Sequence, residues 1–222
     1  RPEFALFNVL EAARKNHIEN FIYASSNAVV GEQEPPINEE KIPAPISPYG
    51  ASKLAGEALC SAYYHSYDIR AISLRFANCY GPYSDHKTSV VAKFIRRAKQ
   101  GKALIIYGDG NQTRDFIHAQ DVCRAIDLAL ECDSQALNAG RDTSDSGLIF
   151  QIGTGRETEI IKLADMIRDL AVESGIKASD VVLEKEQKGD IKKNYADISK
   201  AKELLEFKAQ IELYTGLKRV WT

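Results

Sequence analysis

The sequence lacks the features that mark membrane, secreted and nucleic-acid-binding proteins. No apolar run approaches the roughly 20 residues that a membrane-spanning helix needs, and the N-terminus has no signal-peptide pattern. The 29 Lys and Arg residues nearly balance the 31 Asp and Glu residues, so the net charge is only −2. No basic region favours nucleic acid or an anionic membrane surface. We therefore expect neither nucleic acid nor a membrane as a partner.

Cysteine is also scarce, with four residues that show no paired spacing: Cys60, Cys79, Cys123 and Cys132. This spacing predicts neither a disulfide framework nor a zinc site, so we expect no metal and interpret the four as small buried side chains. Proteins without disulfides are typical of reducing compartments, which indicates the cytoplasm.

Strand-like and helix-like segments alternate along the chain. Apolar residues at helical spacing predict helices, and short apolar runs predict strands. The predicted helices cover 5–15, 48–67, 90–100, 119–132, 159–173, 199–205 and 213–220, and the predicted strands cover 20–25, 71–76, 104–107, 148–152 and 181–183. This alternation predicts an α/β fold with a largely parallel sheet. Five prolines between residues 32 and 48 predict a surface loop.

Tyr49 and Lys53 lie one turn apart on the predicted helix over 48–67, so both side chains project from one face. Ser26 follows the strand predicted over 20–25, and ligands bind at the carboxyl ends of such parallel strands. An ammonium beside a phenol favours the phenolate, which is a general base for a hydroxyl proton. A Tyr and a Lys at this spacing also occur in many surface helices, so the pair alone leaves that alternative open.

Further motifs accompany this pair along nearly the whole chain. In order, they are FIYASS (21–26), Gly31, SPYGASK (47–53), Gly56-Glu57, LRFANCYGP (74–82), YGDG (107–110), RDFIH (114–118), Asp121, IGTG (152–155), Gly189-Asp190, Ala196-Asp197 and SKA (199–201). With these motifs the sequence resembles the extended short-chain dehydrogenase/reductase family. Within that family it is most similar to NAD-dependent nucleotide-sugar epimerases of the UDP-glucose 4-epimerase type.

The resemblance implies a truncated doubly wound (Rossmann-like) parallel sheet with a smaller C-terminal α/β lobe that binds the substrate. It assigns residues 1–89 to the dinucleotide-binding domain and residues 90–222 mostly to the substrate lobe. Segments 115–131 and 148–153 are expected to return to the sheet. The implied cofactor is NAD, the implied substrate is a UDP-sugar, and the implied reaction is transient oxidation at sugar C4 followed by reduction from the other face.

The resemblance also implies the catalytic roles. Tyr49 is the base, Lys53 holds the nicotinamide ribose and favours the phenolate, and Ser26 hydrogen-bonds the reacting hydroxyl group. Phe76 and Ala77 are expected beside the nicotinamide. Tyr49 and Lys53 therefore count as cofactor-binding residues as well.

Six residues are expected to contact the substrate: Ser26, Asn78, Tyr107, Arg114, Asp190 and Asn194. The resemblance places Tyr107 next to the uracil and Arg114 on the diphosphate, a bidentate task that suits a guanidinium. A small residue at Asn194 leaves room for an N-acetyl group. Judged by residue type, a turn residue at Asn78 and a core aromatic at Tyr107 remain open, and we interpret His118 as structural.

The sequence departs from the family pattern in three places. It contains no Gly-x-x-Gly-x-x-Gly loop, so we expect that the cofactor's pyrophosphate seat lies outside this sequence and that the chain alone binds NAD weakly. Gln187 stands where the family usually has a phosphate-binding arginine, with Lys185, Lys188 or Lys192 as candidates to compensate. Asn27 and Ala28 replace the acidic residues of dehydratases, which favours epimerisation without elimination.

Three alternatives remain open at this point. The substrate is UDP-glucuronate or a UDP-N-acetylhexosamine rather than UDP-glucose, or the chain is a non-catalytic family relative that serves as a binding subunit. The intact Ser26, Tyr49 and Lys53 argue against the non-catalytic alternative. We also expect a homodimer that pairs through the helices over 5–15 and 48–67.

Overall fold

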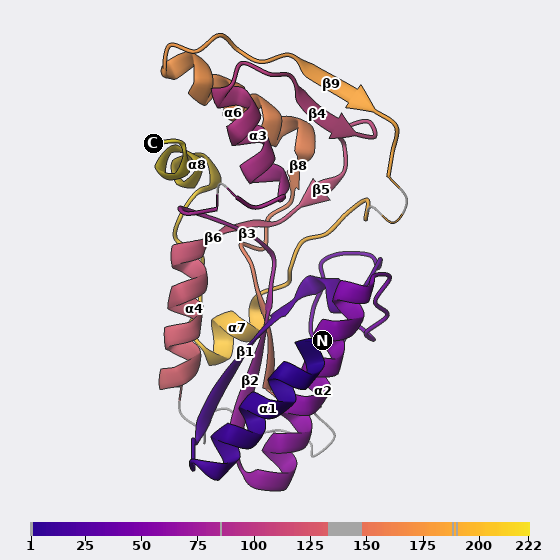
Figure 1. The fold of residues 1–222 in the computed structure, drawn as a ribbon, viewed down its shortest axis with the longest axis vertical. Helices are drawn as coiled ribbons and strands as arrows, with labels where there is room; N and C mark the ends of the chain where they lie inside the picture. The colour runs from indigo at the N-terminus through magenta and orange to yellow at the C-terminus, as the bar shows by residue number, and fades with distance from the viewer. Residues whose placement is uncertain (1, 85, 133–147, 188, 190) are drawn as a thin grey trace.

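The computed structural model describes residues 2–84, 86–132, 148–187, 189 and 191–222, which form an upper and a lower lobe (Figure 1). The lower lobe is built around a three-stranded parallel sheet. Most of the upper lobe comes from segments after residue 89. The polar insertion predicted over 138–147 lies outside the described residues. No helix in the described part of the chain is both long and apolar enough to span a bilayer.

The sheet of the lower lobe has the strand order β1-β2-β7. Its strands are β1 (Asn20–Ser26), β2 (Arg70–Phe76) and β7 (Leu148–Ile152). Ser26 pairs with Phe76, and Phe76 pairs with Ile152, so the carboxyl ends of the three parallel strands meet at one edge. The predicted parallel α/β sheet is confirmed.

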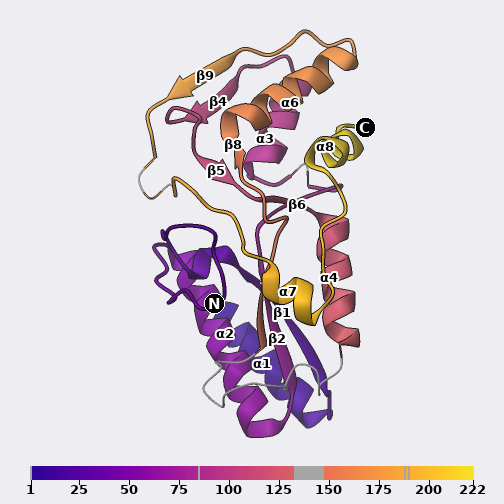
Figure 2. The ribbon, with the colours of Figure 1, turned by 180° about the vertical axis from the view of Figure 1, so that it is seen from behind.

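Helices cover both faces of this sheet, because successive side chains of a strand point to opposite faces. On one face lie α1 (Pro2–Lys15) and α2 (Pro48–Tyr67), which bury Ala71 of β2. On the other face lie α4 (Ala119–Glu131) and α7 (Ser199–Leu204), which bury the next residue, Ile72 (Figure 2).

The ends of α2 follow from local sequence. The hydroxyl of Ser47 accepts a hydrogen bond from the backbone N–H of Gly50 at 3.0 Å and caps the helix, and Pro48 occupies the first turn, where no N–H is needed. At the other end Asp68 adopts a left-handed conformation (φ 54°), which stops the helix. The helix therefore begins and ends where the sequence predicts.

The upper lobe has its own core. A two-stranded parallel sheet of β4 (Leu104–Tyr107) and β9 (Val181–Glu184) packs with three amphipathic helices, α3 (Val90–Lys99), α6 (Ile160–Glu173) and α8 (Leu213–Trp221). The buried core includes Phe94, Ile106, Leu163, Ile167 and Trp221.

The sequence did not predict several short elements. They are η1 (Asn27–Val29), β3 (Asn78–Tyr80), β5 (Thr113–Arg114), β6 (Phe116–His118) and β8 (Thr158–Glu159). Of these, η1 packs against α2, and the others lie where the lobes meet or in the upper lobe. Between β5 and β6 the buried carboxylate of Asp115 accepts hydrogen bonds from the backbone N–H groups of Thr154, Gly155 and Ala196 and from the Thr154 hydroxyl group. This one side chain holds three segments together where the lobes meet.

Candidate active site

Ser26 ends β1 at the edge where the three strands finish. Its Oγ accepts a hydrogen bond from the backbone N–H of Ala28 at 3.2 Å and so caps the short helix η1. The side chain is half-buried. Its hydroxyl group therefore stands at the carboxyl end of a parallel strand, with one lone pair engaged and its proton available to a ligand.

Tyr49 and Lys53 project from the first turns of α2 beside this edge. The Tyr49 side chain is exposed by 56%. Lys53 Nζ donates a hydrogen bond to the backbone oxygen of Ala24 at 2.7 Å and lies 5.8 Å from the centre of the Tyr49 ring. Partial burial lowers the pKa of Lys53 below its usual value. An ammonium held on the strand next to a solvent-facing phenol suits general base chemistry.

A glycine lets α2 approach the turn that carries Ser26. A Cβ built on Gly50 would lie 2.4 Å from the backbone oxygen of Ala28, a distance that no side chain tolerates. Only glycine therefore allows the first turn of α2, with Tyr49, to pack against η1. The Gly50 next to Tyr49 is explained by this contact.

Phe76, Ala77 and Asn78 continue from the same edge toward the upper lobe. Phe76 and Ala77 are half-buried, and the backbone N–H of Ala77 donates a hydrogen bond to the backbone oxygen of Ile152 at 2.9 Å. The side chain of Asn78 is exposed, while its backbone N–H donates a hydrogen bond to the backbone oxygen of Asp115 at 2.9 Å. The expected cofactor residues thus lie at the edge that carries Ser26, and an exposed amide follows them.

Arg114 and Asn194 meet in the region between the lobes, although 80 positions separate them in sequence. The backbone N–H of Asn194 donates to Thr113 at 3.2 Å, and Nη1 of Arg114 donates to the same backbone oxygen at 2.7 Å. Asn194 is buried. Of the other expected residues, Asp190 lies outside the described part of the chain, as does Lys188.

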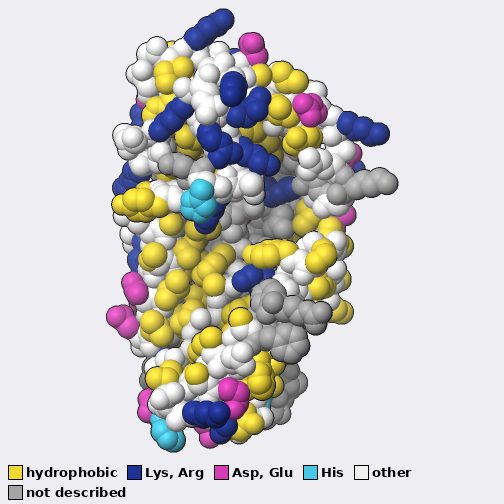
Figure 3. Space-filling model, in the orientation of Figure 1, with side chains coloured by type: hydrophobic (Ala, Val, Ile, Leu, Met, Phe, Trp, Pro, Cys, Tyr) yellow, Lys and Arg dark blue, Asp and Glu magenta, His cyan; other side chains and the backbone are white. Residues whose placement is uncertain are grey.

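Tyr107 and Gln187 line one cavity of about 390 Å³ in the upper lobe, between α3 and β4. The same cavity is lined by four cationic side chains that the sequence did not single out: Lys93, Arg96, Arg97 and Lys102. Figure 3 shows Lys and Arg side chains gathered on this lobe. Lys192 lines a neighbouring cavity of about 360 Å³ together with Tyr107. The neighbourhood of Gln187 is therefore cationic even without an arginine at that position.

The side chain of His118 has a structural place. It is buried, its Nδ1 accepts the backbone N–H of Gln120 at the start of α4, and its ring packs edge-on against Tyr80. Burial lowers its pKa. Among the described residues, no group of three or more His, Cys, Asp and Glu side chains could hold a metal ion.

Comparison with known proteins places this architecture in a family. The NAD dependent epimerase/dehydratase family matches residues 5–140. This chain belongs to that family. Its fold is that of the solved epimerases, including a UDP-glucose 4-epimerase from Thermotoga maritima crystallised with UDP-glucose, at 32% identity and a TM-score of 0.86 over 97% of the chain. The resemblance found in the sequence is confirmed.

Other members of the epimerase/dehydratase family match about as well. A protein of Methanocaldococcus jannaschii named "Putative UDP-glucose 4-epimerase" is 37% identical over 217 residues, which are 96% of this chain and 65% of that protein. A UDP-glucuronic acid 4-epimerase from Bacillus cereus, solved with UDP-glucuronic acid and NAD, is 31% identical with a TM-score of 0.82, over 98% of this chain and 65% of its own. The chain also covers 66% of the Thermotoga maritima enzyme. It thus spans less than two thirds of the length of these relatives.

The sequence missed one set of buried polar residues beneath the site: Ser25, Glu57 and Arg75. Each is exposed by 3% or less, and both Ser25 and Arg75 donate hydrogen bonds to the Glu57 carboxylate. Glu57 follows Lys53 by four residues on one face of α2, which is the signal that the sequence offered. The partners of Glu57 come from two strands and could not be found without the fold.

Proposed function

We propose that this chain is the catalytic and substrate-binding part of an NAD-dependent nucleotide-sugar 4-epimerase that interconverts UDP-glucose and UDP-galactose. The observation that carries the proposal is the meeting of Ser26, Tyr49 and Lys53 at one edge of the sheet, with Lys53 Nζ 2.7 Å from the backbone oxygen of Ala24. Residues 1–89 supply these three side chains, and residues 90–222 mostly bind the nucleotide sugar.

The residues at the edge fit the nicotinamide end of NAD. Lys53 is half-buried and donates from the edge, which suits a ribose hydroxyl group, and half-buried Phe76 and Ala77 offer an apolar wall. For the pyrophosphate end, the sequence contains no Gly-x-x-Gly-x-x-Gly loop. When bound, NAD⁺ supplies a hydride acceptor that is regenerated in each turnover.

The reaction begins with a proton transfer at the C4 hydroxyl group of the sugar. Ser26 Oγ hydrogen-bonds the reacting oxygen, and Tyr49, whose ring centre lies 5.8 Å from Lys53 Nζ, takes its proton as the general base while the hydride leaves C4. The 4-keto sugar then turns within the site. Return of the hydride to the other face of C4, with the proton given back by Tyr49, yields the epimer.

The residues after Ser26 support epimerisation rather than elimination. Asn27 is buried, with 5% exposure, and Ala28 has no polar side-chain group. Neither exchanges a proton with the carbon next to the keto group, which a dehydratase must do. We infer that the keto sugar is reduced again without losing a hydroxyl group.

The identity of the sugar is the finer part of the proposal. The backbone N–H of Asn194 donates to the backbone oxygen of Thr113. From the family resemblance we infer that a small residue at this position leaves room for an N-acetyl group, so UDP-N-acetylhexosamine is a second candidate substrate. UDP-glucuronate is a third, because a relative solved with UDP-glucuronic acid is almost as similar as the one solved with UDP-glucose. A non-catalytic binding role is disfavoured, because a binding subunit does not need the catalytic side chains of Ser26, Tyr49 and Lys53.

We also propose that the chain forms a homodimer through α1 and α2. Their outer surfaces carry Phe7 and Tyr67, exposed by 45% and 49%. Beside them Tyr63 donates a hydrogen bond to Glu11 at 2.6 Å, and Arg14 lies 5.1 Å from the centre of the Tyr67 ring. Aromatic side chains with polar neighbours are typical of protein interfaces. Light scattering at a monomer mass across micromolar concentrations would contradict the dimer.

Hydrophobic side chains also gather on the lower lobe, over β1 and α4 (Figure 3). Leu130, near the end of α4, and Ile18, just before β1, are exposed by 41% and 47%. An apolar face of this kind beside an edge strand is typical of a surface that another segment covers. We propose that a glycine-rich cofactor-binding segment covers it in the active enzyme.

The test compares the chain alone with a hybrid that adds to it the part of the Thermotoga maritima enzyme that this chain does not cover. We expect the chain alone to bind NAD⁺ weakly in calorimetry and the hybrid to interconvert UDP-glucose and UDP-galactose. UDP-N-acetylglucosamine and UDP-glucuronate are assayed beside them. A folded hybrid that binds NAD⁺ but epimerises none of the three sugars contradicts the proposal, and tight NAD⁺ binding by the chain alone contradicts the expected division of the cofactor site.

A further inference from the structure

A row of three buried polar side chains crosses the sheet one residue before the catalytic edge. Ser25 of β1 pairs in register with Arg75 of β2, which pairs with Gln151 of β7. Their exposures are 3%, 1% and 0%. The next row, at the edge itself, begins with Ser26 and Phe76. Buried polar rows are unusual in a parallel sheet, whose strands are generally apolar on both faces.

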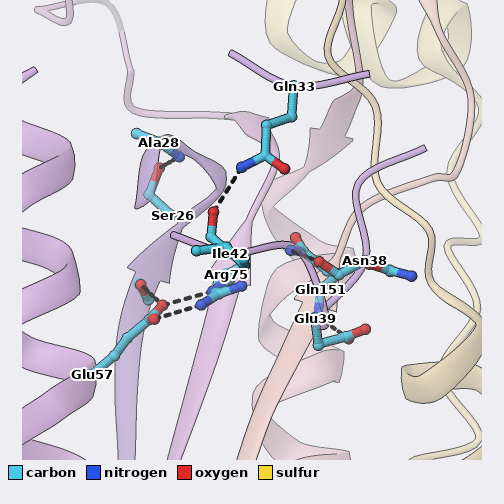
Figure 4. Close-up of polar contacts among 10 residues, drawn as sticks. Ser26, Ala28, Gln33, Asn38, Glu39, Ile42, Glu57, Arg75 and Gln151 are labelled. Carbon is cyan, nitrogen blue, oxygen red and sulfur yellow. Dashed lines mark hydrogen bonds and ion pairs between the residues drawn. The ribbon is translucent and has the colours of Figure 1, made fainter. Parts of the chain in front are cut away.

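Glu57 ties this row to α2. One carboxylate oxygen accepts the Ser25 hydroxyl group at 2.5 Å and Arg75 Nε at 2.9 Å, and the other accepts Arg75 Nη2 at 2.8 Å (Figure 4). Glu57 itself is exposed by only 3%. A bidentate guanidinium pair fixes direction as well as distance. The carboxylate therefore fixes α2 at one position along β1 and β2.

Glu39 ties the far end of the row to the loop that leads into α2. Its carboxylate accepts the backbone N–H of Gln151 at 2.7 Å (Figure 4). At the β1 end of the row, Lys53 Nζ donates a hydrogen bond to the backbone oxygen of Ala24, the residue before Ser25. Contacts with two consecutive residues of β1 thus hold the catalytic helix, and a contact with β7 holds the loop before it.

A buried ion pair is weak evidence for stability, because desolvation of the charges offsets their attraction. Apolar residues of similar volume would pack α2 on the sheet as well, but they would not define its position along the strand. Hydrogen bonds with short, directed geometry do define it. Ser25 is the link that joins this geometry to the residue that precedes Ser26.

On the basis of the proposed function, we propose that Ser25 and Glu57 are positioning residues. Through Arg75 and each other they set where the first turns of α2 lie along β1, and with that the spacing of Ser26, Tyr49 and Lys53. They do not touch the substrate or the cofactor. Their effect reaches the chemistry through the helix.

The test uses this chain, with two matched serine variants. Ser25→Ala removes the link to Glu57 and leaves the ion pair with Arg75. The control is Ser73→Ala, which removes an equally buried serine, exposed by 2%, from the same face of the sheet, where it hydrogen-bonds Cys60 further along α2. Ser25→Thr restores the hydroxyl group and serves as the conservative rescue.

Two readouts separate positioning from general destabilisation. In Ser25→Ala we expect amide hydrogen exchange in the first turns of α2, residues 50–54, to rise by about tenfold relative to the rest of the helix. An NMR titration is expected to show the pKa of Lys53 moving back toward its ordinary 10.5 as the ammonium becomes more hydrated. Ser73→Ala speeds exchange around Cys60 and leaves the Lys53 titration unchanged, and Ser25→Thr behaves as the wild type.

Neither readout requires turnover, so the inference and the proposed function fail separately. If Ser25→Ala and Ser73→Ala change the first turns of α2 and the Lys53 titration equally, or not at all, Ser25 and Glu57 are not positioning residues. An absence of epimerase activity in the hybrid overturns the proposed function, but it does not affect the hydrogen-exchange and Lys53 titration results on this chain. In an active hybrid, Ser25→Ala is expected to lower kcat by about tenfold with KM within about twofold, as loss of alignment does.

Discussion

The ion pair between Glu57 and Arg75 allows a double-mutant test of what holds α2 in place. Arg75→Met leaves the Glu57 carboxylate buried with the Ser25 hydroxyl group as its remaining partner. Removing one member of a buried pair costs about 3–5 kcal/mol. For a chain of 222 residues, each kcal/mol lowers Tm by about 2–4 °C, so we expect a fall of roughly 6–20 °C.

The double variant Glu57→Gln with Arg75→Met removes both charges and keeps an acceptor for Ser25. Because the desolvation of two charges disappears with their attraction, we expect its free energy of unfolding to lie within about 1 kcal/mol of the wild type. Arg156→Met is the exposed control. It removes an ion pair in which Nη1 of Arg156 donates to both carboxylate oxygens of Glu212. Both side chains are exposed by 68%, so the loss should cost about 0–1 kcal/mol.

The assay is urea unfolding followed by circular dichroism at pH 7, with midpoint and slope fitted for each variant. Two results would contradict the expected dependence of Glu57 on Arg75: Arg75→Met no more destabilising than Arg156→Met, or the double variant as unstable as Arg75→Met alone. Either result would mean that Glu57 is not a desolvated charge that depends on Arg75.

Three further predictions concern other parts of the fold. Gly56→Ala places a Cβ 2.2 Å from the Tyr23 hydroxyl oxygen, so we expect a loss of about 1–3 kcal/mol in urea unfolding; an unchanged midpoint would contradict this. Asp115→Asn turns an amide NH₂ toward N–H donors and should cost at least about 1–3 kcal/mol in the same assay; a neutral effect would refute the role of this carboxylate as the acceptor between the lobes. Hydrogen bonding, first from Arg14, lowers the pKa of Glu11 to about 2, so its stabilisation is complete above pH 4.5 and is lost as the pH falls toward 2. Glu11→Gln should flatten the dependence of Tm on pH in that window, and an unaltered slope would show that Glu11 is not the group responsible.

The sequence predicted the regular elements well where the pattern was long or the ends were marked. The helix α2 (Pro48–Tyr67) has the predicted bounds because Ser47 and Pro48 specify its start. β4 and β7 also have the predicted bounds. The short strands β3, β5, β6 and β8 were missed, because two or three residues carry no periodicity and form strands only through pairing with distant segments.

The candidate site could be predicted only as far as its motifs reach. Tyr49 and Lys53 lie on one helix, so their proximity follows from helical spacing. The proximity of Arg114 and Asn194 depends on a backbone contact between segments 80 residues apart, which no local pattern encodes. The cationic residues around Gln187 were missed for a related reason. Lys93, Arg96 and Arg97 read as the solvent side of an amphipathic helix, and only the packing of α3 against β4 reveals the cavity that they line with Lys102.

The central claim is that Ser26, Tyr49 and Lys53 carry out a reversible oxidation at sugar C4. The most direct measurement follows a deuterium label at C4 of UDP-glucose through the reaction of the hybrid, by mass spectrometry and NMR of the UDP-galactose formed. We expect the product to keep the deuterium at C4, because the same hydride leaves and returns, and Tyr49→Phe to abolish its formation. Exchange of the label with solvent, or full activity in Tyr49→Phe, would contradict this claim.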